Sequence, residues 1–395
     1  MKDIRSGKSN NWNPFRMKHP VYLDYNATTP VDTEVAKEMI PYIESFYGNP
    51  SSSYSIGRNN KEAVEKARAQ VAELINCQPE EIYFTSCATE SNNLAIKGIA
   101  WANRDKGRHI ITSEIEHPAV TEVCKYLSSQ GFEITYLPVD RFGRVDPKDV
   151  ENAIRKDTIL ITIMHANNEV GTIQPVREIG AIARHNNIVF HTDASQSVGK
   201  IDTDVDKLGV DLLTIAGHKL YAPKGIGALY IRKGTRIENL MHGANQEKGI
   251  RPGTENVIHT VGLGKACEVA LRDFKQNQRN MQVSRDRLLN GLVSRLGNKV
   301  HVNSNLENCL PNTLSVAFEN ISAHALASFI SSDVLISTGS ACHSGETTIS
   351  SVLQAMNLDF RTAAATVRIS SGKNTPEEEI DFTIEVLVNA IKKLT

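Results

Sequence analysis

The chain has 395 residues, of which 40% are hydrophobic and 23% are charged, and its formal net charge at pH 7 is −1. This length exceeds the range in which one hydrophobic core keeps growing, so two domains are expected. The near-neutral charge offers no electrostatic basis for binding nucleic acid or a membrane surface. No apolar run approaches the roughly 20 residues of a membrane span.

The first sixteen residues are polar and mildly basic, and they lack the apolar stretch of a secretory signal. Residues 1–16 are therefore predicted to be a disordered leader or tail. The six cysteines are irregularly spaced and match neither a metal site nor a dense disulfide framework. Free thiols in a reducing compartment are the simplest interpretation, so a cytoplasmic location is expected. A mitochondrial location is the alternative, although the leader lacks amphipathic apolar content.

Between about residue 60 and residue 235, helical patterns alternate with short apolar runs typical of strands. Helices are expected over 59–75, 89–105, 119–131, 147–157 and 176–187. Strands are expected over 81–85, 109–113, 133–139, 158–166, 188–194, 211–218 and 227–232. Near-continuous apolar strands are expected when helices cover both faces of a sheet. The pattern predicts an α/β domain with a mainly parallel, mixed sheet.

A charged helical segment over 260–297 leads into a second region. Strands are expected there over 312–319, 334–338 and 366–372, and helices over 321–331 and at the C-terminus. This α+β pattern predicts a second, smaller domain.

Polar side chains follow several predicted strands, which is where open α/β sheets bind ligands. Thr85, Ser86 and Thr89 lie where a strand runs into a helix, and their hydroxyl and backbone N–H groups suit an anion. Taken alone, these residues are better explained as a helix cap. Asn168 and His117 follow two further strands, where each alone could simply satisfy the backbone.

Asp193 and Gln196 follow the strand at 188–194, and His218 and Lys219 follow the strand at 211–218. A carboxylate in this position is commonly a helix cap, and a lysine is commonly a solvated surface charge. Directly after a buried strand, however, the pKa of Lys219 can fall far enough for a nucleophile.

Taken together, these groups match the needs of pyridoxal phosphate. That cofactor requires a lysine for its aldehyde, an anion site for its phosphate, an acid for its ring nitrogen and donors for its ring oxygen. Asp193 lies 26 positions before Lys219, a separation that can bring two adjacent strand ends into one crevice.

Cys342 lies among small and polar residues between Ser337 and Ser350, a stretch predicted to be an exposed, flexible loop. A thiol in such a loop is a chemical liability unless the protein uses it. His343 beside it offers a base, although adjacent loop side chains often diverge.

The chain resembles cysteine desulfurases, which belong to the class V aminotransferase group of fold-type I pyridoxal-phosphate enzymes. The matching stretches occur in the family's order and cover nearly everything after Met17. They are VYLDYNATTP, GNPSS, FTSCATESNNLAIKG, MHANNEVGTIQP, HTDASQSVGK, GHKLYAPKGIGALY, RPGTEN, GSACHSG and VRISSG. The resemblance implies a large cofactor-binding domain over 29–275. A small domain, made of 17–28 and 276–395, would carry the cysteine loop.

The resemblance also implies how the cofactor ring is held. Lys219 would bond to the cofactor aldehyde, and Asp193 would pair with the pyridinium nitrogen. Gln196 and Asn168 would flank the ring oxygen, Asn168 also facing the substrate. His117 would stack on the ring and assist proton transfer.

Further residues are implied for the phosphate and the substrate. Thr89, Ala88 and His218 would hold the phosphate, and Thr254 would reach it from the neighbouring subunit of a homodimer. Arg368 would clamp the substrate carboxylate, a task suited to the guanidinium fork. No metal is implied.

By the same resemblance, the enzyme would convert L-cysteine to L-alanine and leave a persulfide on Cys342. An acceptor such as an iron–sulfur scaffold or a sulfur carrier for tRNA thiolation would collect the sulfur. Selenocysteine lyase is the alternative, because Ala216 before GHK and His343 after the cysteine are similar to that group. A non-catalytic scaffold is disfavoured by the intact set of reactive residues, and a transaminase would not need the thiol.

Four positions depart from the family pattern. Cys87 replaces a glycine, and it is expected to crowd the turn near the phosphate unless the backbone there avoids the left-handed region. Ala216 replaces a serine, which removes one hydroxyl from the expected phosphate site. Ala244 and Asn245 stand where a glycine-rich run is usual.

Overall fold

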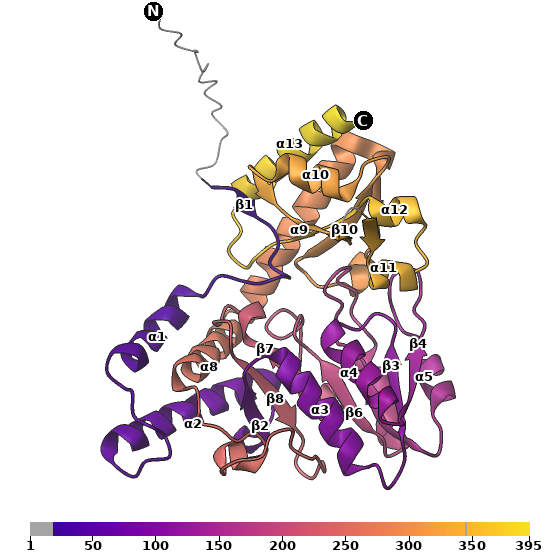
Figure 1. The fold of residues 1–395 in the computed structure, drawn as a ribbon. Helices are drawn as coiled ribbons and strands as arrows, with labels where there is room; N and C mark the ends of the chain where they lie inside the picture. The colour runs from indigo at the N-terminus through magenta and orange to yellow at the C-terminus, as the bar shows by residue number, and fades with distance from the viewer. Residues whose placement is uncertain (1–18, 344–345) are drawn as a thin grey trace, which may run out of the picture.

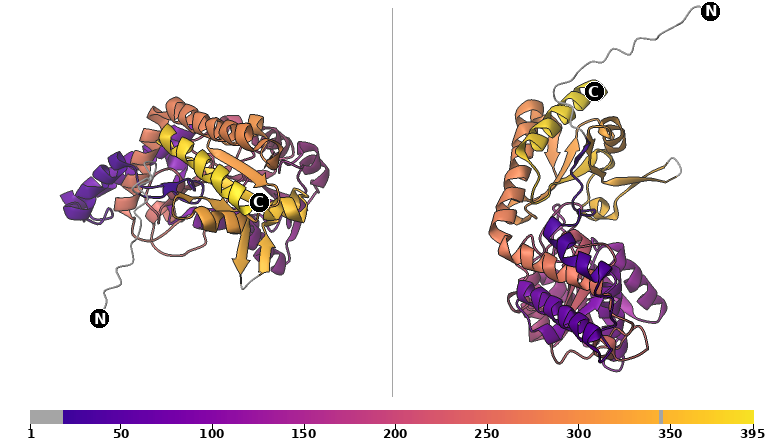
Figure 2. Two further views of the ribbon diagram at one scale, coloured as in Figure 1. Left: turned by 90° about the horizontal axis from the view of Figure 1, so that it is seen from above. Right: turned by 90° about the vertical axis from the view of Figure 1, so that its left-hand side faces the viewer.

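Two sheets with separate hydrophobic cores organise the chain (Figure 1). The computed structural model describes residues 19–343 and 346–395, except for the side chains of residues 340–348. A seven-stranded sheet lies in the lower part of Figure 1 and a four-stranded sheet in the upper part. The long helix α9 (Phe274–Leu296) runs between these two parts along one side, as the right-hand view of Figure 2 shows. The predicted α/β class is confirmed.

The large sheet has the strand order β2-β8-β7-β6-β5-β3-β4. Strand β8 is antiparallel to both of its neighbours, and the remaining pairs are parallel. Most of its strands are buried on both faces, which explains their near-continuous apolar sequences. The strands are β2 (Ile82–Thr85), β3 (His109–Ser113), β4 (Glu133–Leu137), β5 (Thr158–Thr162), β6 (Val189–Asp193), β7 (Leu212–Ala216) and β8 (Gly227–Ile231).

Helices cover both faces of this sheet. One core packs α1, α2, α6 and α8 against it, and a second core packs α3 and α4. The helices are α1 (Thr33–Glu44), α2 (Ser55–Ile75), α3 (Ala88–Ala102), α4 (Pro118–Ser129), α5 (Pro147–Ala153), α6 (Val176–His185), α7 (Val205–Leu208) and α8 (Val257–Arg272). Helix α1 was not expected from the sequence. Pro41 lies inside it, and the Asp32 side chain caps its start.

The small sheet is antiparallel, with the order β12-β15-β10-β9. Strand β1 (Val21–Tyr22) pairs with β11 (Val334–Leu335), and Val21 packs into the hydrophobic core of this sheet. The other strands and helices are β9 (Val300–Val302), β10 (Thr313–Phe318), β12 (Ser337–Thr338), β15 (Thr366–Ser370), α10 (Ala323–Ile330), α11 (Ser351–Ala355), α12 (Phe360–Ala364) and α13 (Glu377–Leu394). Three glutamates at the start of α13 and two lysines at its end suit the helix dipole.

Two expectations from the sequence are corrected here. The stretch predicted as a loop contains a hairpin of β13 (Ser340–His343) and β14 (Glu346–Ile349), in which Cys342 is opposite Thr347. The hairpin extends away from the small sheet in the right-hand view of Figure 2. Its β-branched residues favour strands despite its small and polar character.

The helical segment expected over 260–297 is not one helix, because it is divided at Asp273 into α8 and α9.

None of the helices in the described part of the chain combines the length and the apolar character that a membrane span needs.

A buried ion pair fixes the segment that carries Thr254. The Arg68 guanidinium on α2 donates to both carboxylate oxygens of Glu247, at 2.7 and 2.8 Å. The same carboxylate accepts the backbone N–H of Phe84 at 2.8 Å. The Arg68 and Glu247 side chains are only 8% and 4% exposed, so removing one partner leaves the other charge buried.

We therefore expect Glu247→Ala to lower the free energy of unfolding by about 3–5 kcal/mol, measured by urea denaturation. Glu65→Ala is the matched control, because Glu65 pairs with the same arginine but is 56% exposed. It should cost no more than about 1 kcal/mol. Equal losses in the two variants would contradict a buried, structural pair.

Candidate active site

A cavity of about 270 Å³ opens beyond the carboxyl ends of β5, β6 and β7. Such a position is where open α/β sheets bind ligands. Eight residues singled out from the sequence line it together, although they come from five separate stretches of chain. They are Ala88, Thr89, His117, Asn168, Asp193, Gln196, His218 and Lys219.

Lys219 lies one turn beyond β7, at the end of a short 3-10 helix (Gly217–Lys219). Its Nζ donates to the backbone carbonyl of Asn26. Burial lowers the pKa of Lys219 to about 8, and the positive charge of Arg368 acts in the same direction, opposed by Asp193 and Asp24. At pH 7 roughly a tenth of the amine is therefore neutral, against less than a thousandth for an ordinary lysine, and the neutral amine is the form that a nucleophilic lysine requires.

Asp193 ends β6 and is buried, with 7% of its surface exposed. One carboxylate oxygen accepts the backbone N–H of Ser195 at 2.9 Å, and the other accepts Asn92 Nδ2 at 2.7 Å. These donors hold the carboxylate in one orientation at the cavity wall. Asn92 extends from α3 and lines the same cavity.

His117 caps helix α4, and its Nδ1 accepts the backbone N–H of Ala119 at 3.1 Å. In the neutral ring this bond leaves the hydrogen on Nε2. Burial lowers the pKa of His117, Asp193 opposes the shift and Lys219 adds to it. A neutral, oriented imidazole therefore lies at the cavity wall.

The start of α3 forms one end of the cavity. No side chain caps this helix, so its first backbone N–H groups can face an anion. Cys87, the residue before the helix, has φ −174°, which is extended backbone open to any residue. The cysteine at this glycine position therefore causes no backbone strain. Ala216 also lines the cavity, without the hydroxyl of the family's usual serine.

The other hydroxyl residues proposed for this anion site lie elsewhere. Thr85 and Ser86 line a separate hollow of about 70 Å³. The Thr85 hydroxyl is bonded to Ser91 Oγ at 2.8 Å. The three-residue cradle expected from the sequence is therefore reduced to Thr89. His218 lines the main cavity, and burial together with Lys219 and Lys224 lowers its pKa to about 4.

Arg368, on β15 of the small sheet, reaches the edge of the site. Its Nη1 donates to the carbonyl of Asn168 at 3.0 Å, and its Nη2 to Asp24 at 2.6 Å. Its Nε is buried and has no hydrogen-bond partner. The guanidinium has five N–H groups, so three of them, including Nε–H, are not used by these two bonds.

Three predicted residues are not among those that line the cavity in the described structure, and Arg368, which bonds to the lining residue Asn168, is one of them. Thr254 is exposed and does not line the cavity. It lies in a segment tied to the start of α3, because Arg251 donates to Glu90 at 2.8 Å. The side chain of Cys342 is outside the described part of the structure, which gives only its backbone in β13.

Sequence reasoning missed Asn26, which is fully buried beside the cavity. Its carbonyl accepts from Lys219 and, at 2.9 Å, from Gln196 Nε2. Its Nδ2 donates to the carbonyl of Asn168 at 3.1 Å. The only sequence signal was its place in the first matching stretch, VYLDYNATTP.

The cavity suits a polar, anionic group such as pyridoxal phosphate. Ser195 Oγ and Asn92 Oδ1 are buried, lack partners and belong to lining residues. Unsatisfied buried polar atoms are costly unless a ligand or water meets them. The aldehyde of this cofactor requires a lysine, here Lys219, and its ring nitrogen requires an acid, here Asp193. Its phosphate requires an anion site, here the start of α3.

The model of the aminotransferase class V family matches residues 21–382. The chain belongs to this family. It is 49% identical to cysteine desulfurase IscS of Methanosarcina thermophila over 95% of this chain and 92% of that protein. It is 48% identical to cysteine desulfurase IscS of Dictyoglomus turgidum over 96% of each chain. The resemblance inferred from the sequence is thereby confirmed.

Solved structures of this family share the fold. A NifS-like protein superimposes with a TM-score of 0.89 at 42% identity, covering 95% of this chain and all of that one. A structure of SspA in complex with cysteine gives 0.79 at 40% identity, covering 89% of this chain and 99% of the other.

Because its pKa is lowered, the Lys219 amine is expected to react with an acylating reagent at lower pH than an exposed lysine. In the apoprotein, acetylation of Lys219 by acetic anhydride should rise with pH and reach half its maximum near pH 8, because only the neutral amine reacts. Exposed Lys207, whose pKa is raised by its hydrogen bond to Asp202, is the internal control and should react only at higher pH than Lys219. Peptide mass spectrometry measures both. Titration of Lys219 together with Lys207 would contradict the buried, cation-flanked site.

Proposed function

We propose that this enzyme binds pyridoxal phosphate in the cavity at Lys219, removes sulfur from L-cysteine and holds the sulfur as a persulfide on Cys342. The chain is a cysteine desulfurase by its similarity to relatives that share nearly half of its residues over almost the whole length. The observation that carries the proposal is that Lys219 and Asp193 line one cavity, and that Arg368 of the small sheet bonds to Asn168, a third residue of its lining.

Each residue has a distinct task in this proposal. The bound cofactor would supply an electron sink for the carbon that loses a proton. Asp193, held by Ser195 and Asn92, would be the partner of the ring nitrogen. Lys219, with its lowered pKa, would hold the aldehyde of the cofactor and would accept the Cα proton of the substrate. His117 faces the same cavity with its Nε2–H as a proton donor.

Arg368 would bind the carboxylate of cysteine. Its Nη2 already holds Asp24 and its Nη1 holds the Asn168 carbonyl, so the guanidinium plane is fixed before substrate arrives. The second N–H of each Nη nitrogen and the unpartnered Nε–H are the remaining donors. A preoriented guanidinium loses less entropy when it binds a carboxylate.

Cys342 would take the sulfur atom. Its thiolate attacks the sulfur of the bound cysteine; the new S–S bond forms as the substrate C–S bond breaks, and the electron pair of that bond remains with the substrate carbon. Protonation of the carbon gives alanine. The overall change is L-cysteine plus the Cys342 thiol to L-alanine plus the Cys342 persulfide, which is balanced without an external oxidant.

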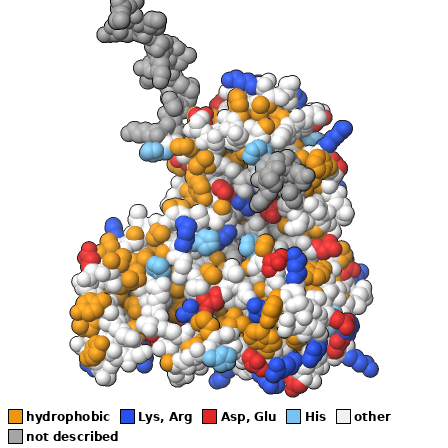
Figure 3. Space-filling view, in the orientation of Figure 1, with side chains coloured by type: hydrophobic (Ala, Val, Ile, Leu, Met, Phe, Trp, Pro, Cys, Tyr) orange, Lys and Arg blue, Asp and Glu red, His pale blue; other side chains and the backbone are white. Residues whose placement is uncertain are grey.

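The acceptor of the persulfide sulfur is proposed to be an iron–sulfur scaffold or a sulfur carrier protein. The enzyme is proposed to act as a homodimer in which Thr254 contributes to the neighbouring site. Exposed apolar side chains on α1 and in the connection between α1 and α2 support an interface, and apolar surface gathers at the lower left of Figure 3. These include Ile40, Ile43, Phe46, Tyr47 and Tyr54.

Cys342→Ser should lower alanine release from L-cysteine by roughly a hundredfold or more, while the visible absorbance of the bound cofactor remains. Cys77→Ser is the control, because burial raises the pKa of the Cys77 thiol to about 12 and removes it as a nucleophile. Mass spectrometry of the wild type should find one added sulfur atom on the Cys342 peptide. Full turnover of L-cysteine by Cys342→Ser would exclude this cysteine as the acceptor, and its turnover of selenocysteine alone would favour the lyase alternative.

A further inference from the structure

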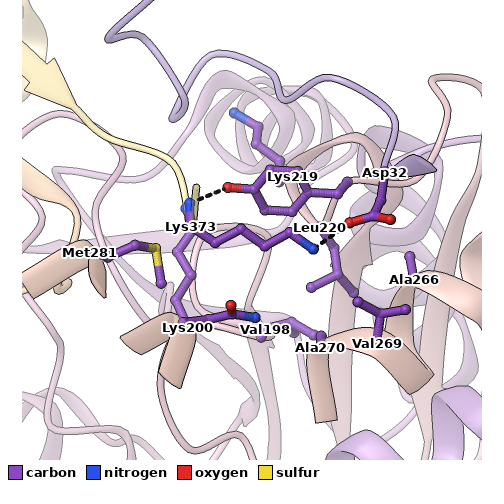
Figure 4. Close-up of a pocket in the computed structure, with 13 residues that line it drawn as sticks. Asp32, Val198, Lys200, Lys219, Leu220, Ala266, Val269, Ala270, Met281 and Lys373 are labelled. Atoms are coloured by element: carbon purple, nitrogen blue, oxygen red, sulfur yellow. Dashed lines mark hydrogen bonds and ion pairs between the residues drawn. The ribbon is translucent and has the colours of Figure 1, made fainter. Parts of the chain in front are cut away.

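A second buried lysine, Lys200, lies behind the cavity. Lys200 is 5% exposed, and it lines a small hollow of about 20 Å³ together with Lys219, Asp32 and Lys373 (Figure 4). It does not line the larger cavity that contains Asp193 and Gln196. A buried lysine is costly unless its ammonium group is used.

The turn after β6 places Lys200 in this position. Gly199 has φ +75°, and a Cβ atom there would lie 2.2 Å from Leu220 Cδ1. Only glycine allows the turn to pack this closely against the residue that follows Lys219. The stretch from Asp193 to Lys200 is thereby pressed against the stretch that carries Lys219.

The ammonium group of Lys200 contacts two amide side chains. Its Nζ donates to Gln196 Oε1 at 3.1 Å and to Asn26 Oδ1 at 3.4 Å. An ammonium group only donates hydrogen bonds, whereas an amide has one accepting oxygen and one donating nitrogen. Protonated Lys200 therefore requires the oxygen of each amide to face it.

When the oxygens of Gln196 and Asn26 face Lys200, the NH₂ group of each amide points toward a different acceptor. Gln196 Nε2 points to the carbonyl of Asn26 at 2.9 Å, the atom that also accepts from Lys219. Asn26 Nδ2 points to the carbonyl of Asn168. Lys200 thus selects between two orientations of Gln196, one with its NH₂ group toward Lys219 and one with its oxygen there.

We propose that Lys200 is a positioning residue of the cofactor site, which holds the Gln196 amide so that its NH₂ group is the donor presented beside Lys219. This inference rests on the proposed binding of pyridoxal phosphate, whose ring oxygen accepts hydrogen bonds. Lys200 acts through Gln196 and touches neither cofactor nor substrate.

The surrounding charges support this assignment. Both acceptors of Lys200 are neutral amides. Burial lowers its pKa to about 7, and the cations Lys219 and Arg368 act in the same direction. The other charged groups around the two lysines are Asp193 and Asp24 on the cavity side, and the Asp32–Lys373 ion pair, at 2.5 Å, across the hollow. With a pKa of about 7, roughly half of Lys200 is protonated at pH 7 and carries the charge that orders Gln196.

The test is a double-mutant cycle on cofactor affinity, read by titrating each apoprotein with pyridoxal phosphate and following its visible absorbance. Lys200→Met, which keeps the length of the side chain and removes its donors, should weaken binding about tenfold. In the Gln196→Ala background the same change should alter affinity less than about twofold, because the group through which it acts is gone. An equal loss in both backgrounds would overturn the proposal and indicate a general structural role.

A second readout does not need the loaded enzyme. In the wild-type apoprotein, acetylation of Lys200 should reach half its maximum near pH 7, and in Lys219→Met this midpoint should rise, because the charge of Lys219 lowers the pKa of Lys200; an unchanged midpoint would argue against the coupling of the two amines. Lys207→Met, at an exposed lysine, should change neither quantity. If Lys200→Met does not fold, judged by thermal unfolding, Lys200→Gln takes its place with the same expected direction. Failure of the wild type itself to bind pyridoxal phosphate would refute the proposed function, whereas normal binding by wild type and Lys200→Met alike would overturn this inference alone.

Discussion

The hydrogen bonds of Asn26 are the interaction on which the site depends. This fully buried residue lies where the two sheets meet. On the side of the large sheet, its carbonyl accepts a hydrogen bond from Lys219 Nζ. On the small-sheet side, its backbone N–H donates to Ser370 Oγ at 3.0 Å, and its Nδ2 donates to Thr313 Oγ1 at 2.8 Å. Since Asn26, Thr313 and Ser370 are buried, losing one of these partners leaves a buried polar atom unsatisfied. The hydrogen bonds of Asn26 therefore fix the position of the small sheet, and with it that of Arg368, relative to Lys219.

A second constraint is the charge of the site. The charges of Lys219 and Arg368 lower the pKa of Lys200, the charge of Arg368 lowers the pKa of Lys219, and the negative neighbours of Lys219 are Asp193 and Asp24. Burial in this setting favours neutral amines, whereas the guanidinium of Arg368 stays charged and favours an anionic group near it. The same cation that helps to make Lys219 a nucleophile would thus favour an anionic substrate.

The sequence predicted the parts of the site that follow from local pattern. Apolar strands ending in polar residues located Lys219, Asp193, His117 and Asn168, and the structure places all four on one cavity. The contacts of Asn26 could not be predicted, because its partners lie between 142 and 344 positions away. The hairpin around Cys342 was missed for a different reason, since its small and polar residues mask the strand tendency of the threonines that follow.

The central claim is that Lys219, and not its buried neighbour Lys200, bonds to the cofactor. Both amines reach Asn26, but only Lys219 also lines the larger cavity. Incubation with pyridoxal phosphate, reduction with borohydride and peptide mapping by mass spectrometry would fix the bond at its lysine. The account predicts the reduced cofactor on Lys219 alone. Its recovery on Lys200, or on any other lysine in place of Lys219, would contradict the account.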